Sequence, residues 1–137
     1  MSNTMVYYID EMTGPIRIPV ASHETKQLTL RFDQKTKDFI KNQASRELSI
    51  QVEAGGSLEL LIISALPAAV QNQVTTSIVL EERSSLKLTE LILDEGEGTY
   101  HTEAVIRGDG AVLDYAGAYG ARNRTKRVHT LLTHHFG

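Results

Sequence analysis

The fold is decided by a stretch that repeats itself: Asn72-Gln-Val-Thr-Thr-Ser-Ile-Val-Leu80, Gly98-Thr-Tyr-His-Thr-Glu-Ala-Val-Ile106 and Arg124-Thr-Lys-Arg-Val-His-Thr-Leu-Leu132. These segments align without gaps at steps of 26 residues, and each ends on a small apolar block. A second series runs between them: Gly56-Ser-Leu-Glu-Leu60, Ser84-Ser-Leu-Lys-Leu88 and Gly110-Ala-Val-Leu-Asp114, at steps of 28 and 26. A near-constant period in the twenties is typical of stacked β units, none of which can bury its apolar face alone.

Each repeat unit contains two strand patterns and two turns. Side chains alternate between apolar and polar around Ile50, and Gly55-Gly56 follows as a turn signal. Two strands in about 26 residues suit one coil of a parallel β-helix, in which Ile78, Ala104 and Thr130 would form an inward column. An antiparallel β-sandwich also has short strands separated by turns, and it is the alternative. The fixed period favours the coil.

The last copy of the second series is irregular. Asp114 falls at the position of Leu88, where an apolar residue is expected. Ala111, Leu113 and Tyr115 would make better inward residues, so a slip by one residue at this point would exchange the two faces of the strand.

The N-terminal third contains weaker strand patterns. Strands are predicted at Met5–Ile9, Ile16–Val20 and Gln27–Phe32 from their apolar and β-branched residues. Proline has no N–H to give to a neighbouring strand, so Pro19 predicts an edge strand or a stack end.

The chain is interpreted as a single domain over residues 1–137. Residues 1–47 are its less regular part, since the strand pattern dissolves between Asp33 and Arg46, and residues 48–137 are the regular coils.

Composition excludes several classes of function. The net charge of −3 argues against a surface for nucleic acid, and the absence of cysteine excludes disulfides, thiolate-held clusters and a cysteine nucleophile. We find no secretory signal, no apolar segment long enough to span a bilayer, no phosphate-binding glycine loop and no nucleophile elbow. A cytoplasmic protein that is not an enzyme, without a cofactor and without nucleic acid or membrane as partner, is therefore expected.

Three histidines near the C-terminal end are weak candidates for metal ligation: His129, His134 and His135. His129 and His135 share one parity along a strand, and His101 or Glu103 would be a further ligand. A step of 26 residues would place His101 beside position 127 and not beside His129, which favours ordinary polar histidines.

The segments Gly56–Leu60, Leu86–Glu90, Gly110–Gly117 and Val128–His135, in this order and spacing, resemble the core of the SufB/SufD family of iron–sulfur cluster assembly proteins. The resemblance covers about 80 of the 137 residues. It implies a right-handed parallel β-helix, and the absence of cysteine is more similar to SufD. The family's later coils and its C-terminal helical segment, which contacts the ATPase subunit SufC, have no counterpart here, so the resemblance implies a C-terminally short chain and carries over no cluster-binding residue.

The expected function is a non-catalytic scaffold or interaction subunit of a SufBCD-type complex. An open stack of coils leaves strand edges that must be paired. The prediction is a homodimer, or a SufB/SufC-type partner, bound at the last coil through Val128, Leu132 and Phe136. A small carbohydrate- or ligand-binding β domain is the alternative.

Overall fold

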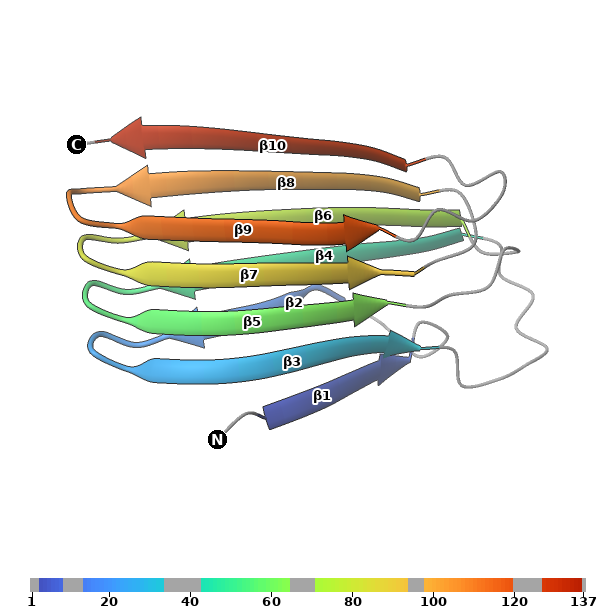
Figure 1. Cartoon of the computed structure of the whole chain (residues 1–137), viewed down its shortest axis with the longest axis horizontal. Helices are drawn as coiled ribbons and strands as arrows, with labels where there is room; N and C mark the ends of the chain where they lie inside the picture. The colour runs from blue at the N-terminus through green and yellow to red at the C-terminus, as the bar shows by residue number, and fades with distance from the viewer. Residues whose placement is uncertain are drawn as a thin grey trace.

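The computed structural model of the chain describes residues 3–8, 14–33, 43–64, 71–93, 98–119 and 127–136. Within these residues the chain forms ten β-strands (Figure 1). Their bounds are β1 Asn3–Tyr8, β2 Ile16–Val20, β3 Thr25–Asp33, β4 Gln43–Val52, β5 Ser57–Ser64, β6 Gln71–Leu80, β7 Ser85–Ile92, β8 Gly98–Arg107, β9 Val112–Tyr119 and β10 Arg127–Phe136.

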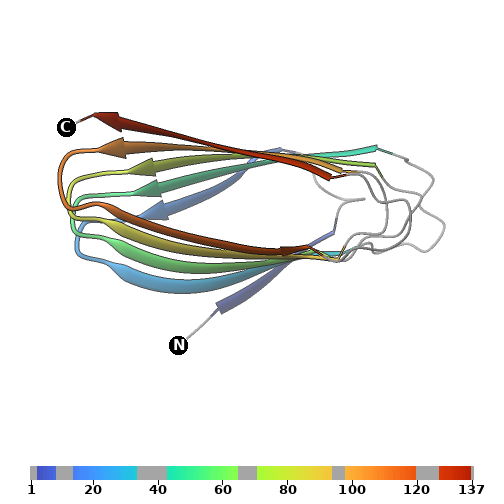
Figure 2. The same cartoon turned by 45° about the horizontal axis from the view of Figure 1, so that its top comes forward.

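The strands lie in two sheets that face each other (Figure 2). The odd sheet has the order β1-β3-β5-β7-β9, and the even sheet has the order β10-β8-β6-β4-β2. All neighbouring strands pair in parallel. The chain therefore crosses from one sheet to the other after every strand and winds as a coil. The expected all-β, parallel β-helix-like architecture is confirmed, and the antiparallel sandwich, which would need hairpin pairing, is wrong.

The coil length varies more than the sequence repeat indicates. Ile50 pairs with Ile78, 28 positions later, and Ile78 pairs with Ala104, 26 positions later, as predicted. Ala104, however, pairs with Thr133, 29 positions later. The prediction that residue 130 continues this column is therefore wrong, since Thr130 pairs with His101.

The irregular copy slips by one residue, as the pattern of its side chains indicated. Leu86 pairs with Leu113, and Leu88 pairs with Tyr115. Leu113 and Tyr115 pack against the core, whereas the side chain of Val112 is 57% exposed. The slip keeps the apolar residues of β9 on the inner face of the odd sheet.

The core between the sheets consists of columns of aliphatic side chains, one from each coil. In the odd sheet Leu28, Leu60 and Leu88 lie in register and are buried. In the even sheet Ile50 and Ile78 face them from the corresponding column. Burial of a leucine or isoleucine side chain is worth about 1.5–3 kcal/mol, so these columns dominate the stability of the stack.

A buried charge interrupts the core near the C-terminal ends of β3 and β5. The side chain of Arg46 lies 4.3 Å above the ring of Phe32 and donates a hydrogen bond of 3.4 Å from Nη1 to Ser64 Oγ. Arg46 is only 3% exposed. The aromatic ring and the hydroxyl replace part of the water that the guanidinium loses on folding.

The turns that join the even sheet to the odd sheet also stack. Main-chain hydrogen bonds continue between coils through these turns, for example from Gly55 N to Glu82 O at 3.0 Å. One turn position has positive φ in each of the four turns, and its residues alternate between large and small: His23 (60°), Gly55 (75°), Arg83 (56°) and Gly110 (78°). A Cβ at Gly55 would lie 2.6 Å from His23 Nδ1, so glycine here makes room for the turn of the preceding coil.

The N-terminal strands belong to the same two sheets as the later coils. Met5–Ile9 and Gln27–Phe32 were predicted as strands, and β1 and β3 occupy these positions within one or two residues. Buried and exposed residues alternate along β2, and β2 is the outermost strand of the even sheet. The prediction that Pro19 marks an edge strand is confirmed. Residues 34–42, where the sequence pattern dissolves, lie outside the described residues.

Candidate functional site

The sequence placed a candidate interface on the last coil, and the structure places that coil at one end of the stack. Among the described strands β9 is outermost in the odd sheet and β10 is outermost in the even sheet. Each therefore has a neighbouring described strand on one side only, β7 and β8 respectively (Figure 1). An outermost strand offers a row of N–H and C=O groups to which another strand can pair.

This end of the stack has few features that block pairing. Proteins usually protect sheet edges with proline, lysine or other charged residues. β9 contains Asp114 as its one charged residue, and β10 contains Arg127 and histidines but neither proline nor lysine. Val112 adds an exposed aliphatic side chain on β9. The edges are therefore suited to pairing with a further strand.

The predicted interface residues are evenly spaced along β10. Val128, Leu132 and Phe136 lie in register with Thr99, Glu103 and Arg107 of β8. All three share one parity, so the pleat assigns them to one face of the even sheet. Their side chains lie outside the described part of the structure, which places these residues by main chain alone.

The histidines are placed by main chain in the same way. His129 pairs with Tyr100, His134 with Val105 and His135 with Ile106. The expectation that His101 would lie beside residue 127 is wrong, because the step of 29 residues places it beside Thr130, one residue from His129.

Among the side chains that the structure describes, no three His, Cys, Asp or Glu residues gather as metal ligands. The candidate ligands His129, His134 and His135 lie outside those side chains, so the metal hypothesis stays a prediction.

Two adjacent carboxylates, of the residue type that a carbohydrate-active site would need, lie in one turn of the stack. Glu81 and Glu82 lie in the turn after β6 and are each matched by an arginine. Glu81 Oε2 lies 3.8 Å from Arg107 Nη1, and Glu82 Oε1 lies 3.6 Å from Arg83 Nη1. Both pairs are solvent-accessible surface ion pairs, which usually contribute little to stability.

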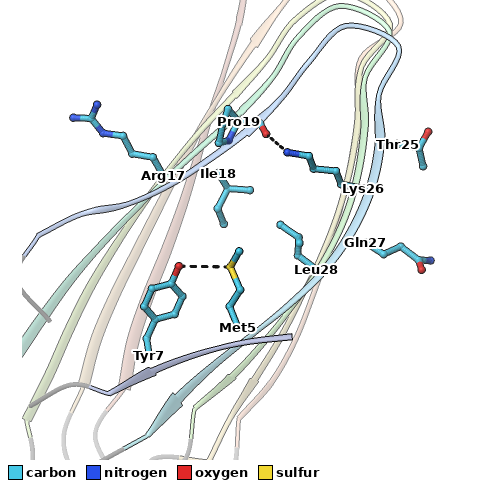
Figure 3. A pocket seen from close by; sticks show the side chains of 9 residues that line it. All are labelled: Met5, Tyr7, Arg17, Ile18, Pro19, Thr25, Lys26, Gln27 and Leu28. Atoms are coloured by element: carbon cyan, nitrogen blue, oxygen red, sulfur yellow. Dashed lines mark hydrogen bonds between the residues drawn. The ribbon is translucent and has the colours of Figure 1, made fainter. Parts of the chain in front are cut away.

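A cavity of about 320 Å³, which the repeat pattern does not predict, lies at the other end of the stack (Figure 3). Its inner wall is aliphatic, with Ile18 of β2 opposite Leu28 of β3, and Met5 and Tyr7 of β1 lie below them. The Tyr7 hydroxyl donates a weak hydrogen bond of 3.6 Å to Met5 Sδ. The described part of β1 pairs with β3 from Leu28 onward, and Thr25, Lys26 and Gln27 of β3 line the cavity.

Lys26 stands at the mouth of this cavity and connects the two sheets. Its Nζ donates a hydrogen bond of 2.9 Å to Pro19 O and lies 3.4 Å from Glu24 Oε1. Lys26 is in register with Leu58, at the end of a column that is otherwise leucine. Its aliphatic stem continues the column while its ammonium group covers the exposed carbonyl of the edge strand.

Comparison of the chain with protein-family models, with curated proteins and with solved structures finds no match. No helix among the described residues is long and apolar enough to cross a membrane.

Proposed function

We propose that this chain is a non-catalytic scaffold or interaction subunit related to iron–sulfur cluster assembly, of the SufB/SufD type, that acts in the cytoplasm. The observation that carries the proposal is the pair of unblocked outermost strands, β9 and β10, at the same end of a parallel coil. The described strands at that end offer main-chain edges to another protein.

The positions of the family-like segments support this proposal. Gly56–Leu60, Leu86–Glu90 and Gly110–Gly117 fall on β5, β7 and β9, which are neighbours in the odd sheet. The fourth, Val128–His135, falls on β10. We also propose that the coil is right-handed, because connections between parallel strands of one sheet are almost always right-handed.

The proposed partner is a second copy of the chain or a SufB/SufC-type protein. It would pair a strand with β10 and cover the face that includes the positions of Val128, Leu132 and Phe136. The main-chain hydrogen bonds would give affinity, and the side chains on alternate positions would give specificity.

Light scattering over a range of protein concentrations tests this proposal, first with the chain alone and then mixed with purified SufB-type and SufC-type proteins. We expect a dimer of the chain, or a complex that elutes with one of the two partners. Leu132→Lys should abolish this association. Ser77→Lys is the matched control, since Ser77 occupies the same register row on the interior strand β6 and is exposed.

A strict monomer at high concentration that binds neither partner would contradict the scaffold proposal. A thermal-shift screen with sugars and divalent metals covers the alternative, because a ligand that binds only the folded chain raises the melting temperature. A large shift with a sugar would favour a carbohydrate-binding domain. A shift with zinc that is lost in His129→Asn, His134→Asn or His135→Asn would identify the metal site.

A further inference from the structure

The outer face of the odd sheet, which is nearer the viewer in Figure 1, carries an apolar strip. Along β5, Leu60 and Ile62 are buried in the core, so the pleat directs Leu61 and Ile63 outward. Both are partly exposed, as is Leu91 of β7, which lies in register with Ile63. Among the described residues no strand packs on this face (Figure 2).

A row of polar and charged side chains borders this strip. It crosses the sheet in register and consists of Gln27 of β3, Glu59 of β5, Lys87 of β7 and Asp114 of β9. Each of these side chains is exposed. Glu59 accepts a hydrogen bond of 2.6 Å from Gln27 Nε2, and its other carboxylate oxygen lies 3.8 Å from Lys87 Nζ. The charges of this row therefore alternate in sign from β5 to β9.

From this pattern we propose that a second copy of the chain packs face to face on the odd sheet, around a two-fold axis that runs parallel to the strands between β5 and β7. This axis places β5 over β7 of the partner, and β3 over β9 of the partner. Residues of one register row stay opposite the same row of the partner. Sheets that pack in this way keep their strands nearly aligned and lie about 10 Å apart.

The charged row selects this axis. Glu59 lies opposite the partner's Lys87, and the two-fold repeats the contact, so charges of opposite sign face each other throughout. Gln27 lies opposite the partner's Asp114, and its amide nitrogen has a second hydrogen to donate to that carboxylate. An axis centred on β5 or on β7 would instead set Glu59 against Glu59, or Lys87 against Lys87, and like charges across an interface oppose association.

The apolar strip matches around the same axis. Ile63 lies opposite the partner's Leu91, and the two-fold repeats this contact in the middle of the interface. An axis one strand closer to β1 would set Arg31, which is in register with Ile63, against that isoleucine and would press a guanidinium onto an aliphatic side chain. A second copy therefore complements both the charged row and the apolar strip, whereas an unrelated partner would need to carry the same alternation of charge.

Sedimentation equilibrium of the full chain tests the proposal, with Leu132→Lys present in every sample to remove association through β10. We expect the Leu132→Lys chain to remain a dimer. Adding Ile63→Lys should weaken this dimer about tenfold or more, because a lysine would then face Leu91 at the centre of the interface. Val79→Lys is the matched control and should change the dissociation constant less than about twofold, since Val79 is also partly exposed but lies on the outer face of the even sheet. Circular dichroism checks that the variants stay folded.

Two charge variants test the position of the axis. Glu59→Lys sets a lysine against Lys87, and Lys87→Glu sets a glutamate against Glu59, so each variant alone should dimerise about tenfold more weakly or worse. An equal mixture of the two variants should recover the dimer, because every facing pair then has opposite charges. Contacts within one chain do not explain such a recovery, since each variant keeps like charges at both positions.

The control for this mixture places the same changes of net charge on the other sheet. Arg17 and Glu47 are exposed on the outer face of the even sheet. Arg17→Glu and Glu47→Lys should each dimerise as the parent chain does, and mixing them should leave the dissociation constant unchanged.

Three results would overturn the proposal. They are a Leu132→Lys chain that stays monomeric up to about 1 mM, equal effects of Ile63→Lys and Val79→Lys, and a mixture of Glu59→Lys with Lys87→Glu that stays monomeric. Where β10 also joins two chains, the wild type forms assemblies larger than a dimer. The fall in mass from wild type to Leu132→Lys reports on β10, and the mass that remains reports on the odd sheet, so either proposal can fail without the other.

Discussion

Val112 and Leu113 are neighbours on β9, and the one-residue slip places them on opposite faces of the odd sheet. Leu113 packs against the core in the column that contains Leu86, while Val112 is exposed to solvent. A strict repeat would reverse the two roles. Replacing each residue by alanine therefore measures the register of the last coil directly.

The expected magnitudes follow from burial. Leu86 is 1% exposed with a described strand on both sides, so Leu86→Ala should cost about 3–4 kcal/mol, within the usual range for a buried leucine. Leu113 is only partly buried and has a described neighbour on one side, so Leu113→Ala should cost about 1–2 kcal/mol. Val112→Ala should cost about 0.5 kcal/mol or less.

Urea unfolding followed by circular dichroism measures these differences. For a two-state transition, each variant should change the midpoint while leaving the dependence of the unfolding free energy on urea unchanged. A coil at the end of a stack can also unfold on its own, and an altered urea dependence in Leu113→Ala would reveal this. The reasoning is refuted if Val112→Ala costs as much as Leu113→Ala, because β9 would then follow the uninterrupted repeat.

Three further variants test individual contacts. Gly55→Ala should lower the unfolding free energy by about 1–3 kcal/mol in urea titrations, because φ is +75° and an added Cβ would lie 2.6 Å from an imidazole nitrogen of the preceding coil; a neutral result would mean that this turn relaxes freely. Arg46→Ala should cost about 2–4 kcal/mol by the same assay, since it removes the buried guanidinium from the ring of Phe32, and a loss no larger than at an exposed arginine would contradict this. The hydrogen bond from Ala21 N–H lowers the pKa of Glu24, so this group stabilises the fold above the ordinary glutamate pKa and loses the contribution as the pH falls through its lowered value. The stability difference between wild type and Glu24→Gln should accordingly shrink in that acid range, and a difference that stays constant with pH would argue against it.

The strand content and the coil were predictable because alternation and repetition are local properties of the sequence. The pattern around Ile50 and Ile78 fixes both the faces and the pairing, since a slip would bury polar side chains. Pro19 predicted that β2 is an edge strand, because proline has no N–H to donate to a neighbouring strand.

The register of β10 was not predictable in the same way. Leu131 and Leu132 are adjacent and both apolar, so the apolar pattern does not decide which of them faces the core. Extra residues between β9 and β10 do not alter that pattern either. The strand pairs at a step of 29 and not 26, which moved His101 beside Thr130.

The N-terminal cavity was missed for a different physical reason. It lies between β2, β3 and the described part of β1, and the arrangement of these three segments leaves no periodic mark in the sequence. Lys26 was the one available sign, because it occupies a leucine position, and the apolar pattern alone assigned it no role.

The alternation of large and small residues at the stacked turns constrains how this protein can lengthen or shorten. His23 and Arg83 each overhang a glycine of the following coil, and a Cβ at Gly110 would lie 3.2 Å from Arg83 Cγ. Duplicating or deleting one coil would set two bulky corners, or two glycines, on top of each other. Changes by two coils preserve the order, so a pair of windings is the unit that this corner can gain or lose without disturbing the alternation.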